Sequence, residues 1–152
     1  MERRLTEERI TKSIVSWLEK NGWDIICFDF PQSGTGKILH PNIRANNLKN
    51  KQGIIPDIVA LKNKKVVFFE NKDKFVLADF KKVESIKINN DYSDSISGLL
   101  SAHSYNYIYY GVGLPLEDKC TKKAMENKCK VDFIISCDDS FIEITYQSES
   151  IF

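Results

Sequence analysis

The sequence predicts an α/β fold with a mixed central sheet flanked by helices on both faces. Three observations favour it: segments with helical periodicity alternate with short β-rich runs, two of those runs are apolar on both faces, and a short hairpin turn joins them. The length of 152 residues is typical of one domain, so we treat residues 1–152 as a single unit.

The first elements are defined by local signals. A helix follows Thr6, which is placed to cap it, and ends at Asn21-Gly22; its apolar stripe includes Ile10 and Ile14. A strand is predicted over residues 23–30, where Pro31 ends it. Residues 32–53 are rich in Gly, Asn, Lys and Pro, and a loop of that length in a compact domain favours a binding function.

The remaining elements continue the alternation. A hairpin is predicted from strands at residues 54–61 and 65–71, with Ile55 and Val59 on one face and Ile58 and Ala60 on the other. Helical spacing then predicts helices, and β-rich runs predict strands, in the following order: helix 75–88, short helix 94–102, strand 105–112, helix 117–130, strand 131–137 and strand 141–146.

Composition excludes several classes of protein. With 42% hydrophobic and 28% charged residues and only short apolar runs, the chain has the composition of a soluble protein without a membrane span. The acidic residues Glu7 and Glu8 occur where a secretion signal would become apolar, which favours a cytoplasmic location. The four cysteines form no C-x-x-C pair, so reduced, packed thiols are expected.

The net charge of +1 conceals an uneven distribution. Residues 37–82 contain eleven Lys and Arg against four Asp and Glu, a local net charge of +7, and the flanking regions are acidic. If this segment folds to one side, it could face a polyanion. Lysine-rich turns are also common on solvated surfaces, so charge alone does not decide between the two interpretations.

One charged cluster is not explained by packing. A turn centred on Asn63 and Lys64 places Asp57 opposite Glu70, with Cβ atoms about 5 Å apart, and strand alternation points Lys72 to the same face. Neighbouring acids are destabilising unless a proton or cation lies between them, and oxygen ligands suit Mg²⁺. The structural alternative is an ordinary salt bridge between strand-end charges.

Ile55-Pro56-Asp57, followed by Glu70-Asn71-Lys72, resembles the signature of the PD-(D/E)XK nuclease superfamily, and the order helix, three strands, helix, strand is similar to its core. The resemblance covers roughly residues 6–110 and implies a restriction-endonuclease-like core. It further implies Mg²⁺-dependent phosphodiester hydrolysis, with Mn²⁺ as a substitute. Asp57 and Glu70 would be metal ligands, the Asn71 carbonyl a further ligand, and Lys72 would act at the attacking water.

An acid on the first helix completes some sites of this family. Glu7 or Glu8 could take that place here, although an acid in the first turn is also explained by the helix dipole. The chain is most similar to a small type II restriction endonuclease because of its length and its long loop before the motif. Such an enzyme implies double-stranded DNA as substrate and a homodimer, with one scissile phosphate for each protomer.

Candidate DNA contacts lie in and beside the long loop. Arginine and lysine suit guanine and asparagine suits adenine in the major groove. The candidates are Lys37, Arg44, Asn46, Asn47, Lys49 and Lys51.

Two alternatives remain open from the sequence. The same fold could belong to a junction-resolving or repair nuclease that recognises branched DNA. It could also belong to a non-catalytic nucleic-acid-binding module, although the intact set of two acids and a lysine argues against the loss of activity.

Overall fold

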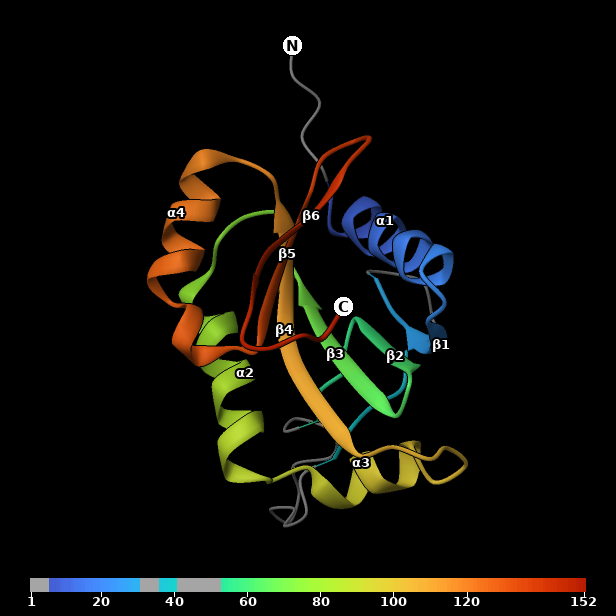
Figure 1. The fold of residues 1–152 in the computed structure, drawn as a ribbon. Helices are drawn as coiled ribbons and strands as arrows, with labels where there is room; N and C mark the ends of the chain where they lie inside the picture. Colours follow the sequence, from blue (N-terminus) through green and yellow to red (C-terminus); the bar gives the residue numbers. More distant parts are fainter. Residues whose placement is uncertain (1–5, 31–35, 41–52) are drawn as a thin grey trace.

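A six-stranded mixed sheet forms the centre of the described part of the protein (Figure 1). The computed structural model describes residues 6–30, 36–40 and 53–152. The strands follow one another across the sheet in chain order: β1 (Asp24–Phe28), β2 (Ile58–Lys62), β3 (Lys65–Asn71), β4 (Tyr107–Pro115), β5 (Phe133–Cys137) and β6 (Ile142–Gln147). The pairs β3–β4 and β4–β5 are parallel and the other three pairs are antiparallel.

Helices cover both faces of this sheet, which confirms the predicted α/β class. The helices are α1 (Glu7–Lys20), α2 (Leu77–Asn89), α3 (Ser93–Leu99) and α4 (Asp118–Glu126), and a 3-10 turn (Lys128–Lys130) follows. Figure 1 shows α1 on one side of the sheet and α2 and α4 on the other. Ile10, Ile14 and Leu18 of α1 pack on one face, and Phe80 and Val83 of α2 on the opposite face.

The β2–β3 hairpin has the expected register. Its two-residue turn places Asn63 and Lys64 at φ 50° and 64°, the left-handed backbone that a type I′ turn requires. Ile58 pairs with Phe69, and residues along each strand alternate between the face covered by α1 and the opposite face, where α3 packs on the hairpin.

Several predicted boundaries are wrong by a few residues. β2 begins at Ile58 rather than residue 54, because Ile54 instead exchanges two backbone hydrogen bonds with Leu39, at 2.6 and 2.8 Å. Ile55, expected inside the strand, is 41% exposed. β4 continues to Pro115 because its last residues pair with β5, and α4 ends at Glu126.

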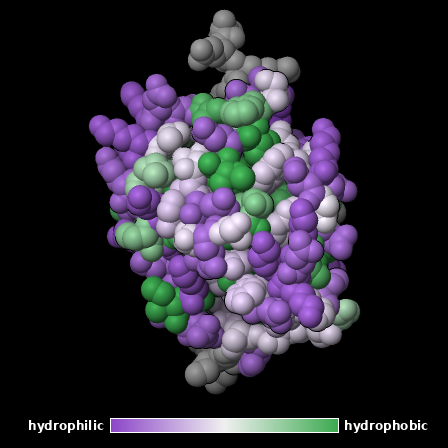
Figure 2. All heavy atoms as spheres, in the orientation of Figure 1, coloured by the Kyte–Doolittle hydropathy of each residue, from purple (hydrophilic) through white to green (hydrophobic). Residues whose placement is uncertain are grey.

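One face of the molecule is mainly polar. The face shown in Figure 2 carries hydrophilic side chains over most of its area, with smaller apolar patches between them. None of the helices in the described residues has the length and apolar character that crossing a membrane would require. Cys27, Cys120 and Cys137 are buried, Cys129 is exposed, and all four are free thiols as expected.

Candidate functional site

Asp57 is held at the open end of the β2–β3 hairpin by its backbone. Its N–H donates to the carbonyl of Phe69 at 3.0 Å, and its carbonyl accepts from the N–H of Asp29 at 2.8 Å. The residue therefore lies between the end of β1 and the end of β3, although it precedes β2. The paired register of the hairpin ends at Ile58–Phe69, one position before Asp57, and the charge of Glu70 is close enough to act on Asp57.

The side chain of Asp57 lies in an environment that disfavours its charge. Burial, followed by the nearby charge of Glu70, raises its pKa to about 8. The N–H of Asn71 opposes this shift by donating to Asp57 Oδ2 at 2.6 Å. A carboxyl group whose pKa is raised this far by burial and a second acid is a candidate for a functional site.

Glu70 points to the α2 face of the sheet. Its side chain is 17% exposed, and its Oε2 accepts a hydrogen bond from Lys82 Nζ of α2 at 3.2 Å. Burial raises the pKa of Glu70, and Lys82 counteracts part of that rise. An apolar cavity of about 30 Å³ lies against Glu70 and includes Phe68 and Val83 in its lining, which accounts for the poor solvation of the carboxylate.

Lys72 lies one residue beyond the end of β3, and its N–H still bonds to β4, donating to the carbonyl of Gly113 at 3.0 Å. Its charge acts on Glu70, as expected from the sequence, and its Nζ also lies 3.3 Å from Oε1 of Glu7, in the first turn of α1. Although burial opposes the change, Glu7 and Asp79 raise the pKa of Lys72 and keep it charged. Of the two acids considered on the first helix, Glu7 reaches this cluster, whereas Glu8 pairs with Lys12.

Asn71 connects the site to α1. Its side chain is buried on the α1 face, where Nδ2 donates to Thr11 Oγ1 at 3.0 Å. Its Oδ1 has no hydrogen-bond partner among the described residues. The backbone N–H of Asn71 thus binds the carboxylate of Asp57, and its side chain binds helix α1. The role of the Asn71 carbonyl as a metal ligand stays a prediction.

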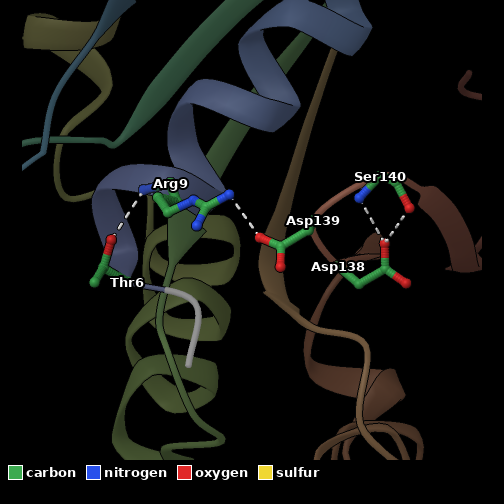
Figure 3. Close-up of polar contacts among 5 residues, drawn as sticks. All are labelled: Thr6, Arg9, Asp138, Asp139 and Ser140. Carbon is green, nitrogen blue, oxygen red and sulfur yellow. Dashed lines mark hydrogen bonds and ion pairs between the residues drawn. The ribbon is translucent and has the colours of Figure 1, made fainter. Parts of the chain in front are cut away.

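The first turn of α1, which carries Glu7, is fixed at both sides (Figure 3). Thr6 caps the helix as predicted, with its Oγ1 accepting from the N–H of Arg9 at 3.2 Å. The guanidinium of Arg9 forms an ion pair with Asp139 at 2.6 Å, in the β5–β6 turn. Asp138 in the same turn accepts from the N–H of Ser140 at 2.9 Å. These contacts position the carboxylate that meets Lys72.

Asp57 and Glu70 are the two side chains at this site that could hold a hard divalent cation. In the described ranges, no three His, Cys, Asp or Glu side chains are grouped so that they could hold a metal ion. Mg²⁺, however, is commonly bound through one or two carboxylates, with water and phosphate oxygens completing its octahedron. Asp57 and Glu70 supply two carboxylates, and their raised pKa values indicate a pair that a cation would stabilise.

A scan against protein-family models finds no match, and a search of curated proteins finds none either. The case for a functional site therefore rests on the geometry of Asp57, Glu70 and Lys72 and on the sequence motif that contains them. Among the predicted DNA contacts, Lys37 is exposed on the surface. The other five lie outside the described residues: Arg44, Asn46, Asn47, Lys49 and Lys51.

Sequence reasoning missed two residues that contribute to the charge of the site. Lys82 and Asp79 lie three residues apart in α2, so they share the helix surface that faces the end of β3. That spacing was visible in the sequence. What could not be read there was how α2 packs against the hairpin.

Proposed function

We propose that this protein is a divalent-metal-dependent DNA endonuclease of the PD-(D/E)XK type, with a restriction-endonuclease-like core. The convergence of Asp57 and Glu70 at one end of the hairpin, with Lys72 beside them, carries the proposal. The mixed sheet and the preceding helix α1 are consistent with that core. Mg²⁺ is the proposed cofactor and Mn²⁺ its substitute.

Each charged residue has a role in this proposal. The bound ion would supply Lewis-acid stabilisation of the phosphate and a more acidic water. Asp57 and Glu70 hold the ion, and the backbone contacts of Asp57 fix the direction of its carboxylate. Lys72 keeps its positive charge through Glu7 and orients the attacking water or a phosphate oxygen.

The proposed substrate is double-stranded DNA, cut at a specific sequence by a homodimer. Lys72 and Lys82 beside the acid pair support a polyanionic substrate, and Arg44 and Asn46 are of residue types suited to base edges. A domain of 152 residues that cuts both strands would need a second copy for the second phosphate.

The test is incubation of a long, unmodified DNA with purified protein and Mg²⁺, followed by sizing of the products. Discrete bands are expected, and Asp57→Asn should lower cleavage to background while the exposed control Asp91→Asn cuts normally. A smear would contradict sequence specificity. Cleavage of four-way junctions alone would favour the junction-resolving alternative, and full activity of Asp57→Asn would overturn the site.

A further inference from the structure

Two lysines approach the acid pair from different elements of the described structure. Lys72, at the end of β3, contacts Glu7 of α1 at 3.3 Å. Lys82, in α2, contacts Glu70 at 3.2 Å. The lysine that contacts Glu70 directly is therefore Lys82 of α2, on the face of the sheet to which Glu70 points, while Lys72 of the motif acts on Glu70 without a direct contact.

The position of Lys82 is determined by the core. Its neighbours Phe80 and Val83 are 1% and 5% exposed and pack on the β4–β5 part of the sheet. The backbone of α2 is thus fixed, and the flexible stem of Lys82 carries the ammonium to Glu70. The side chain is 36% exposed, so the same stem can also extend into solvent.

This ion pair engages one oxygen of a carboxylate that a bound metal ion would also use. A divalent cation between Asp57 and Glu70 must bind a Glu70 carboxylate whose Oε2 now accepts from the Lys82 ammonium. Two cations about 4 Å apart repel each other strongly where burial limits screening by water, and Glu70 is largely buried. Metal binding and the Lys82 contact therefore oppose each other.

We propose that Lys82 is an exchangeable counter-ion of Glu70: it neutralises this carboxylate in the metal-free protein, competes with the incoming divalent ion, and is released toward the phosphodiester when that ion binds. This inference rests on the proposed metal site and assigns a regulating cation to it. Release of Lys82 places its positive charge beside the substrate only when the metal is bound. Binding of the metal and binding of the substrate are therefore coupled.

The experiment is calorimetric titration of the metal-free protein with Mn²⁺, which requires no cleavage. Lys82→Met removes the competing charge and retains an unbranched stem, so Mn²⁺ should bind about tenfold more tightly. Lys81→Met changes the net charge equally at an exposed neighbour in α2 and should alter the affinity less than about twofold. Lys82→Arg keeps the charge and should stay within about threefold of the wild type.

The outcomes separate this inference from the proposed function. If the wild type binds no Mn²⁺, both are overturned. If it binds Mn²⁺, and Asp57→Asn and Glu70→Gln weaken that binding, the metal site stands. In that case, unchanged or weaker Mn²⁺ binding by Lys82→Met would overturn the counter-ion role alone. Tighter Mn²⁺ binding by Lys82→Arg would also overturn the counter-ion role, because this variant keeps the charge and the effect would then come from packing.

Discussion

The carboxylate of Asp57 combines a rigid position with an unfavourable charge. Backbone hydrogen bonds to Asp29 and Phe69 fix the residue, and the N–H of Asn71 donates to its side chain. Burial and the proximity of Glu70 nevertheless outweigh that donated hydrogen bond and raise the pKa. A group held in this way weakens the folded state whenever it is ionised, which is a cost typical of functional sites.

The raised pKa of Asp57 predicts how the free energy of unfolding depends on pH. The pKa of Asp57 is about 8 in the folded protein against an ordinary value of 3.8, so between these values the folded state binds more protons than the unfolded state. The contribution of Asp57 to stability therefore falls as pH rises from about 4 to 8. Asp57→Asn keeps an acceptor for the Asn71 N–H and should raise the free energy of unfolding at pH 8 by about 1–2 kcal/mol.

Urea unfolding between pH 5 and pH 9 measures this effect. The difference between Asp57→Asn and the wild type should grow with pH across that range. Asp91→Asn, a change of the same type at an exposed residue, should run parallel to the wild type. A constant difference at all pH values would show that Asp57 is not protonated in the folded protein.

The residues of the site differ in how far the sequence could predict them. The neighbourhood of Asp57 and Glu70 was predictable because a two-residue turn fixes the register of the whole hairpin. The ion pair of Lys72 with Glu7 was not, because it depends on where the first turn of α1 lies against the end of β3. The approach of Glu7 and Lys82 depends on how two helices pack on opposite faces, which no local pattern specifies.

At the scale of elements, the packing around the β3–β4 pair depends on Gly113, which lies opposite Asn71. Gly113 pairs with Asn71, and its carbonyl accepts from the N–H of Lys72 at 3.0 Å. A Cβ atom at Gly113 would clash with Oδ1 of Asn71 and with Cδ1 of Ile14. The absence of a side chain here allows α1, β3 and β4 to meet behind the candidate site.

Gly113→Ala should consequently destabilise the protein by about 1–3 kcal/mol, the usual range for overpacking a core. Gly98→Ala is the matched control: a Cβ at Gly98 meets no described atom within 4 Å, and Gly98 lies in helix α3. Alanine there should stabilise the protein by about 0.5–1 kcal/mol. Thermal unfolding of both variants gives the comparison, and equal effects would contradict the close contact at Gly113.

Element types were predictable where local signals agreed, and boundaries were not where a distant pairing decided them. Capping by Thr6 and the apolar stripe fixed α1 from the sequence. The start of β2 was misplaced because Ile54 pairs with Leu39, fifteen positions earlier, and no periodicity in either segment indicates that bridge. The C-terminal end of β4 was predicted too early because the last residues of this strand pair with β5.

At the scale of the whole molecule, the lysines of the basic segment that the structure describes do not all gather on one side. Lys62 and Lys65 flank the hairpin turn, where their ammonium groups donate to the carbonyls of Asn21 and Ile151 at 2.6 and 2.9 Å. Lys72 and Lys82 lie at the opposite end of β2–β3, roughly 20 Å away along the strands. Among the described residues, these lysines are thus divided between the two ends of the hairpin, and Lys72 and Lys82 are the pair that lies beside the acids.

This division predicts which lysines contribute to DNA affinity if the proposed substrate is correct. Lys74, exposed just after β3, should contact a phosphate, so Lys74→Gln should weaken binding and reduce the slope of log K against log salt by about one. Lys64→Gln, in the hairpin turn, should change neither quantity measurably. Fluorescence anisotropy with a labelled duplex, in EDTA to prevent cleavage, measures both. Equal losses of DNA affinity in the two variants would mean that DNA contacts both ends of the hairpin. The DNA backbone would then not be bound only at the end that holds Asp57 and Glu70.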